Sequence, residues 1–353
     1  MDPNTLNAIK GAAGAGGGGY SGDVAVAYES SPYIHVYPWV SGTGFGTKYT
    51  DPGTAAPTRL TAGTNISFSP DGADLAIVGS SSPYIHVYPW SSGTGFGTKY
   101  ADPSTLPAGY GYGVAFSPDG ADLAVAHTSS PYISVYPWSS GFGTKYADPG
   151  TLISCYTPYC VAFSPDGADI AVAHDTSPYI SVYPWSSGFG TKYADPSTLP
   201  AGTCHGLAFS PDGADLVLAH GGGDYLSAYP WVSGSGFGTR YADPTTKPSG
   251  SRRTVAFSPD GADVAIVGGG SPYINVYPWS SGFGTKYADP TTYTWTTIYG
   301  ASFSPDGADI VLGHNSGDYL SAYPWVSGSG FGTSYTTPAT IVTYCKAIAF
   351  SPA

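Results

Sequence analysis

Apolar and polar residues alternate in short runs along almost the whole chain. Between Gly113 and His127 the apolar runs GVAF and LAVA flank the turn sequence PDGAD, and in the next segment Ile133 and Val135 alternate with Tyr132, Ser134 and Tyr136. Alternation with a period of two around an Asp-Gly turn is typical of antiparallel strands. The apolar period of 3.6 that a helical repeat requires is absent. The pattern therefore predicts an all-β protein.

The same unit returns seven times. The elements FSP, YPW and GFGT each occur seven times, and consecutive FSP elements are 46 to 48 residues apart. We expect four strands in each unit: one before PDGAD, one after it, one that ends in YPW, and a last one in segments such as TKYAD. Four short strands in a repeat of this length are typical of a β-propeller blade. The sequence predicts a seven-bladed β-propeller of four-stranded antiparallel blades.

The two ends of the chain predict how the ring closes. The first unit begins SGDVAVAY, which matches the second strand of the other units, and the chain finishes with KAIAFSPA, which matches a first strand. We expect the C-terminal strand to join the N-terminal blade, because closure removes open sheet edges. Residues 20–353 are then one propeller, and the Gly/Ala-rich residues 1–19 are predicted to be a docking arm.

The repeated text resembles two groups of known proteins. FSPDGADLAVAHTSSPYISVYPW is similar to the blades of the WD-repeat propeller family from Ser21 onward, which implies the same fold. The chain departs from that family by lacking its Gly-His pair, by having YPW in place of Trp-Asp, and by keeping the Asp of the inner hydrogen-bond network only at Asp224 and Asp318. The unit PYISVYPWSSGFGTKYADP also resembles repeat proteins among the structural genes of tailed bacteriophages, which implies a virion context.

Charge and composition narrow the possible functions. Charged residues make up only 10% of the chain and the net charge is −12, which argues against binding to a nucleic-acid backbone. No apolar run is long enough for a membrane span. Glu29 is the only glutamate, and no nucleophile motif or phosphate loop is present. We therefore expect no enzymatic activity and no cofactor.

Histidines and cysteines are candidates for metal binding, and their spacing argues against it. Four histidines occupy equivalent positions in different units, too far apart for one ion, so we expect hydrogen-bonding anchors in loops. The cysteines form no Cys-x-x-Cys pair, so we expect free thiols, and neither set predicts a metal site. The residues are His127, His174, His220 and His314, and Cys155, Cys160, Cys204 and Cys345.

The variable positions between the repeats are the candidate binding residues. They lie four or six residues before the Phe of each FSP element, or elsewhere in the crossover between units, and are rich in Tyr, His, Arg and Lys. We expect these crossovers to surround the mouth of the central channel and to form a variable face; neutral drift of surface loops is the alternative. The candidates are Thr64, Tyr110, Tyr112, Tyr159, His205, Arg253, Trp295, Tyr299, Tyr344 and Lys346.

These observations lead to a hypothesis of a non-enzymatic binding or structural module. The favoured version is a tailed-phage virion component on the capsid exterior or tail. Its N-terminal segment would dock to other virion proteins, and its variable face would meet a host surface glycan or protein. One alternative is a secreted or cell-surface lectin, since tyrosine and tryptophan suit stacking on sugars. A further alternative is an intracellular scaffold for protein interactions.

Overall fold

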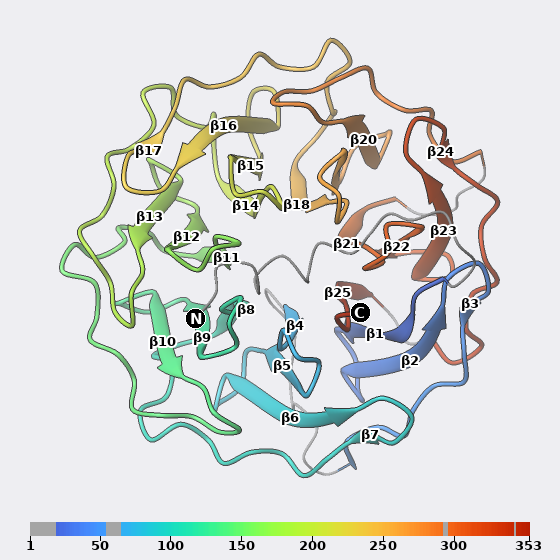
Figure 1. Ribbon diagram of the computed structural model, residues 1–353, viewed down its shortest axis with the longest axis horizontal. Helices are drawn as coiled ribbons and strands as arrows, with labels where there is room; N and C mark the ends of the chain where they lie inside the picture. Colours follow the sequence, from blue (N-terminus) through green and yellow to red (C-terminus); the bar gives the residue numbers. More distant parts are fainter. Residues whose placement is uncertain (1–18, 54–64, 292–295, 342–343) are drawn as a thin grey trace, which may run out of the picture.

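The protein is a ring of seven small antiparallel sheets around a central axis (Figure 1). The computed structural model describes residues 19–53, 65–291, 296–341 and 344–353, and these residues contain strands and no helix. The predicted all-β, seven-bladed β-propeller is confirmed. The proposed docking arm, residues 1–19, lies outside the described residues except for Gly19, so that assignment stays a prediction.

Each sheet is a blade whose first strand lies nearest the axis (Figure 1). These innermost strands are β4 (Ile66–Phe68), β8 (Gly111–Phe116), β11 (Pro158–Phe163), β14 (Cys204–Phe209), β18 (Arg252–Phe257), β21 (Ile298–Phe303) and β25 (Cys345–Phe350). The second strands are β1 (Ser21–Tyr28), β5 (Asp74–Val78), β9 (Asp122–His127), β12 (Asp169–His174), β15 (Asp215–His220), β19 (Asp263–Gly268) and β22 (Asp309–His314).

The outer part of each blade differs from the sequence prediction. The third strands are β2 (Ile34–Val40), β6 (Ile85–Ser91), β10 (Ile133–Pro137), β13 (Ile180–Pro184), β16 (Leu226–Val232), β20 (Ile274–Pro278) and β23 (Leu320–Val326). A two-residue fourth strand follows in four blades: β3 (Gly44–Phe45), β7 (Gly95–Phe96), β17 (Gly236–Phe237) and β24 (Gly330–Phe331). The other three blades have a single bridge there, such as Trp138 with Phe142.

The fourth strand therefore lies at the sequence GF, and the prediction of a strand in TKYAD is wrong. The segment after GFGT makes side-chain contacts in place of a ladder. Lys145 forms an ion pair with Asp148, and the Tyr146 hydroxyl donates a hydrogen bond to Asp122 over 2.9 Å. The segment stays beside the third strand and keeps one backbone hydrogen bond to it, from the Tyr146 N–H to the Val135 carbonyl oxygen over 2.9 Å, which does not make a ladder.

The ring closes as expected. β25 pairs antiparallel with β1, from Val24 opposite Phe350 to Ala27 opposite Ala347, and the closing sheet has the order β25-β1-β2-β3 (Figure 1). Beside this seam the Tyr20 hydroxyl donates a hydrogen bond to the carbonyl oxygen of Ser351 over 2.8 Å. The first and last parts of the chain thus build one blade together.

A buried carboxylate joins each blade to the next. Asp122, at the start of β9, accepts one hydrogen bond from Tyr146 of its own blade and one from the indole of Trp185 in the following blade, each 2.9 Å long. We call this arrangement the Asp-Tyr-Trp clamp. It recurs around the whole ring at Asp23, Asp74, Asp122, Asp169, Asp215, Asp263 and Asp309.

The clamp explains why the repeated text is nearly constant. The second Asp of DGAD, the Tyr of TKY and the Trp of YPW form one hydrogen-bonded set, and a buried carboxylate requires such partners. The first Asp, for example Asp119, caps the turn by accepting hydrogen bonds from Ser117 Oγ (2.6 Å) and the Ala121 N–H (3.1 Å). The two aspartates of DGAD therefore differ, since Asp119 is exposed and Asp122 is buried.

The four equivalent histidines are hydrogen-bonding residues, as predicted, although they lie in strands and not in loops. His127 Nε2 is 2.9 Å from Ser134 Oγ on the neighbouring strand, and the same pairing occurs at His174, His220 and His314. All four imidazoles are buried. All four cysteines are free thiols.

Three blades lack this histidine and have Tyr28, Gly79 or Gly268 at its position. In the blade with Gly268 a buried arginine, Arg252, lies opposite the glycine in the ladder. The Arg252 side chain is fully buried and donates hydrogen bonds to the backbone carbonyls of Ser249 (2.6 Å), Pro272 (3.1 Å) and Tyr273 (3.2 Å). Arg252 thereby ties the start of β18, which carries Arg253, to the adjacent loop.

Candidate functional site

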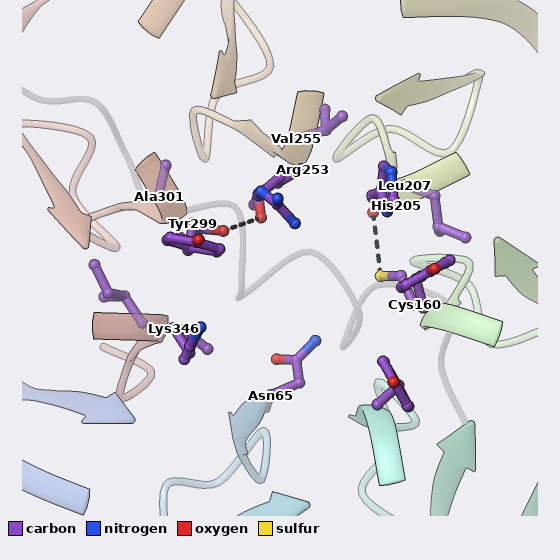
Figure 2. A pocket seen from close by; sticks show the side chains of 16 residues that line it. Asn65, Cys160, His205, Leu207, Arg253, Val255, Tyr299, Ala301 and Lys346 are labelled. Atoms are coloured by element: carbon purple, nitrogen blue, oxygen red, sulfur yellow. Dashed lines mark hydrogen bonds between the residues drawn. The ribbon is translucent and has the colours of Figure 1, made fainter. Parts of the chain in front are cut away.

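A cavity of about 520 Å³ lies at the centre of the ring and is lined by side chains from all seven blades (Figure 2). The blades whose innermost strands are β8, β11, β14, β18, β21 and β25 each contribute the residue that lies four positions before the Phe of FSP. The blade whose innermost strand is β4 contributes Asn65. Those six residues are Tyr112, Tyr159, His205, Arg253, Tyr299 and Lys346.

A β-bulge aims each of the six side chains into the cavity. Tyr112 falls where the register between β8 and β9 shifts, because Gly111 and Gly113 pair with His127 and Ala126 and leave no partner for the residue between them. The other five residues also fall at a register shift of their innermost strand. The extra residue of a bulge is unpaired and bends the strand, which is how proteins redirect a side chain next to a functional site. These residues were expected in crossover loops, and the structure places them in strands.

One half of the cavity wall is aromatic. The rings of Tyr112 and Tyr159 meet edge to face with centroids 5.5 Å apart, and the centroids of Tyr159 and His205 are 4.5 Å apart. Burial raises the pKa of both tyrosines, so their hydroxyls stay protonated and can donate hydrogen bonds. Rings in this arrangement offer a surface on which a flat or sugar-like ring can pack.

His205 is a neutral imidazole at neutral pH. Burial, and to a smaller extent the charge of Arg253, lowers the pKa of His205 to about 4. Its Nδ1 atom is buried and has no hydrogen-bond partner among the described residues. A neutral imidazole has one basic nitrogen, so His205 can accept a proton from a bound water or hydroxyl group.

The other half of the wall carries the positive charge. The guanidinium carbon of Arg253 lies 4.6 Å from the centroid of the Tyr299 ring, and the Lys346 ammonium nitrogen lies 4.4 Å from it. Figure 2 shows Arg253, Tyr299 and Lys346 gathered on this side, across from Cys160. Such cation–π contacts hold the two cations in the wall of the cavity.

The two cations differ in their partners. Lys346 forms an ion pair with Glu29, at a distance of 3.3 Å between Nζ and Oε2. Arg253 has no carboxylate within ion-pair distance among the described residues, and its Nε is buried without a hydrogen-bond partner. The free cation at the cavity is therefore Arg253.

The remaining predicted residues lie elsewhere. Tyr110 and Tyr344 do not line the cavity: they are 48% and 42% exposed, and pack beside Tyr84 and Tyr319 respectively, at centroid distances of 6.1 and 6.3 Å. Thr64 and Trp295 lie outside the residues that the structure describes.

A second ring of lining residues was not predicted from the sequence. These residues lie three positions before the Phe of FSP and are small or short: Asn65, Cys160, Gly206, Thr254, Gly300 and Ala347. The physical reason is close approach of neighbouring innermost strands, since a Cβ on Gly206 would come 2.5 Å from the carbonyl oxygen of Arg253. Small residues at a fixed offset from FSP were the available signal.

Two observations on the described part of the chain concern metal-binding clusters and membrane-spanning helices. There, no group of three or more His, Cys, Asp or Glu side chains is placed to hold a metal ion. Within the same residues no helix has the length and hydropathy of a membrane span.

No protein-family model matches the sequence, and no curated protein matches it. Solved structures do match. The periplasmic gluconolactonase of Pseudomonas aeruginosa is 16% identical, with a TM-score of 0.69, over 94% of this chain and 99% of that one. A proposed 6-phosphogluconolactonase of Bacteroides fragilis is 15% identical, with a TM-score of 0.69, over 94% and 98%. Hydrazine synthase of Kuenenia stuttgartiensis is 17% identical, with a TM-score of 0.60, over 81% and 89%. At these identities the likeness shows the fold alone.

The comparisons contradict the hypothesis of a non-enzymatic virion component and its lectin and scaffold alternatives. Propellers that match almost the whole chain carry the names of lactone-hydrolysing enzymes. The hypothesis took the constant repeats as a sign of virion context, whereas they encode the Asp-Tyr-Trp clamps. It also dismissed catalysis because no contiguous motif exists, but a propeller cavity takes one side chain from each blade.

Proposed function

We propose that the protein hydrolyses a small lactone derived from a sugar acid in the central cavity. The observation that carries this proposal is the placement of the neutral imidazole of His205 and the unpaired guanidinium of Arg253 at equivalent bulges of adjacent blades, in one cavity. The cavity volume of about 520 Å³ is ample for the six-membered ring of a sugar-acid lactone. The similarity in fold to named lactonases supports the same reaction class.

Lactone hydrolysis needs a base and a group that stabilises negative charge. Water attacks the carbonyl carbon, one water proton is lost, the bond to the ring oxygen breaks, and the ring oxygen takes up a proton. His205 would accept the first proton and return it to the ring oxygen. Arg253 would stabilise the negative charge that develops on the carbonyl oxygen. The product is a hydroxy acid with a free carboxylate.

The low basicity of His205 restricts the substrate. A base whose pKa is about 4 activates water weakly, so the ester must be intrinsically reactive. Lactones of sugar acids meet this requirement because water already opens them slowly without a catalyst. The rings of Tyr112 and Tyr159 would pack against the sugar ring, and their hydroxyls would donate hydrogen bonds to its oxygens.

Rates of glucono-δ-lactone hydrolysis test the proposal. We expect His205→Asn and Arg253→Gln each to lower kcat/KM by about 100-fold, the usual effect of removing a general base or an oxyanion donor. Lys247→Gln is the control, since it removes only ion pairs with Asp224 and Asp243 at the surface. A wild-type rate no faster than the spontaneous one, across several sugar-acid lactones, would reject the proposal.

We also propose that the protein is related by descent to the WD-repeat propellers that its repeats resemble. It is supported by the repeated FSPDG turn and by the tryptophan-aspartate hydrogen bonds between blades. It carries no information about the reaction, because none of those residues lines the cavity.

A further inference from the structure

We propose that the cavity selects ligands with a single negative charge and that Glu29 sets this selectivity. Such ligands are the hydroxy-acid product of an unphosphorylated lactone and the transition state that leads to it. The inference rests on the proposed function and narrows its substrate class. It follows from which charged groups at the cavity have partners and which have none.

Among the described residues that line the cavity, Arg253 is the one cation without a carboxylate partner. Lys346 lines the cavity, but Glu29 lies 3.3 Å from its ammonium nitrogen and already neutralises it. Arg253 has no such partner among the described residues. A guanidinium binds a carboxylate in a bidentate manner, which satisfies one negative charge completely.

A second carboxylate acts on the aromatic half of the wall. The negative charge of Asp175 acts electrostatically on Tyr112, Tyr159 and His205. Asp175 accepts hydrogen bonds from the Tyr156 N–H (3.0 Å) and the Thr176 hydroxyl (2.9 Å), and no cation pairs with it among the described residues. Asp175 thus adds negative charge beside the aromatic half of the wall, which disfavours a second negative charge on a ligand there.

A phosphorylated ligand fits this arrangement of charges at the cavity poorly. A phosphate monoester carries close to two negative charges at neutral pH and needs several donors. Arg253 satisfies one charge, and the second would require Lys346 to leave Glu29, whose carboxylate would then repel the phosphate. Like charges brought together at a binding site cost affinity and suppress the wrong partner.

The fold fixes Glu29 in the position that this role requires. Glu29 directly follows β1, and Lys346 lies in β25, so the ion pair spans the seam where the ring closes. The Glu29 N–H also donates a hydrogen bond to the carbonyl oxygen of Tyr344 over 3.1 Å. Glu29 therefore acts through Lys346 as a residue that determines specificity, without contacting the reacting atoms.

Binding of two stable product analogues tests the inference. Calorimetric titration of the full chain with D-gluconate and with 6-phospho-D-gluconate gives a ratio of dissociation constants. We expect the wild type to bind gluconate at least tenfold more tightly. Glu29→Gln, which keeps the shape but removes the charge, should shift the ratio about tenfold toward the phosphorylated ligand, and Glu29→Asp should restore the wild-type preference. Asp102→Asn is the matched control, because Asp102 pairs with Lys99 away from the cavity.

Each result decides between the two proposals. An unchanged ratio in Glu29→Gln, or a wild type that prefers the phosphorylated ligand, would overturn the charge selectivity even if lactones are hydrolysed. The expected ratios without any hydrolysis would leave the selectivity standing and remove the enzymatic function. If neither ligand binds, the charge selectivity is wrong, and the rates of lactone hydrolysis alone decide the enzymatic function.

Discussion

The indole nitrogen of Trp39 donates a hydrogen bond to the carboxylate of Asp309, 3.2 Å away and 270 residues along the chain. Asp309 also accepts a hydrogen bond of 2.6 Å from the hydroxyl of Tyr335. This clamp joins the last blade to the first, in the same way that the other six clamps join consecutive blades. The ring thus closes through a side-chain clamp as well as through the β25-β1 ladder.

Removing the closing carboxylate should destabilise the ring. Asp309→Ala leaves the buried indole of Trp39 and the half-buried hydroxyl of Tyr335 without their acceptor, so we expect the free energy of unfolding to fall by about 3 kcal/mol. Tyr335→Phe removes one donor and should cost about 1 kcal/mol. Urea unfolding followed by tryptophan fluorescence measures both, with Asp122→Ala as an internal clamp for comparison. A loss below 1 kcal/mol for Asp309→Ala would contradict a structural role for the closing clamp.

The buried histidines predict loss of stability in acid. Burial lowers the pKa of six histidines to about 4, against about 6.5 in an unfolded chain; they are His35, His86, His127, His174, His205 and His314. Between these values the unfolded chain binds more protons than the folded protein. The free energy of unfolding should therefore be highest above pH 6.5 and fall steadily as the pH drops toward 4.

Urea titrations at pH 7.5, 6.0 and 5.0 check this dependence. His127→Gln combined with His174→Gln should flatten it, because two of the titrating groups are removed, whatever its effect at pH 7.5. A free energy of unfolding that stays constant from pH 7.5 to 5.0 would show that these imidazoles are not buried in their neutral form.

If His205 is the base, the rate of lactone hydrolysis should follow its protonation. We expect kcat/KM to be level from pH 5 to 8 after subtraction of the spontaneous rate, and to fall with a midpoint near pH 4 as His205 takes up a proton. Arg253→Gln should move the midpoint of the residual activity upward, because the Arg253 charge contributes to lowering this pKa. Brief exposure to acid, with fluorescence confirming the folded state, separates this effect from unfolding. A midpoint near 6.5 would identify a different, solvated base.

The close approach of β14 and β18 predicts an effect of Gly206→Ala on the cavity. The added Cβ would come 2.5 Å from the Arg253 carbonyl oxygen and 2.9 Å from the Thr254 Cα, and backbone atoms cannot move away cheaply. We expect a loss of about 2 kcal/mol in stability. We also expect at least a tenfold loss in binding of D-gluconate, since the strands that carry His205 and Arg253 are forced apart. Gly150→Ala is the matched control, because its Cβ would meet no atom within 4 Å. Equal behaviour of the two variants would contradict the packing described.

Much of the fold could be predicted because each blade is specified locally. The alternating runs, the PDGAD turn and the spacing of FSP gave the seven blades, and the unmatched end fragments gave the β25-β1 closure. The weakest prediction was the fourth strand. Its two-residue ladder carries no alternation, and the following TKYAD segment is shaped by side-chain bonds such as Tyr146 to Asp122.

The positions of the site residues were predicted from the sequence, but the direction of their side chains and their ion pairs were not. The residue four before each FSP Phe was identified as variable, and six of these residues do line the cavity. Their direction depends on bulges, which the sequence does not mark. The pairing of Lys346 with Glu29 could not be foreseen, because the two residues meet only when the ends of the chain join.

By itself, then, the sequence determined the all-β architecture, the number of blades and the way the ring closes, because strands and turns depend on neighbouring residues. Tertiary structure alone decided which aspartates are buried, which side chains face the axis, and that Arg253 is left without a carboxylate while Lys346 has one. Those properties depend on contacts between blades, such as Trp185 with Asp122 and Lys346 with Glu29, and such contacts exist only once the blades have packed into a ring.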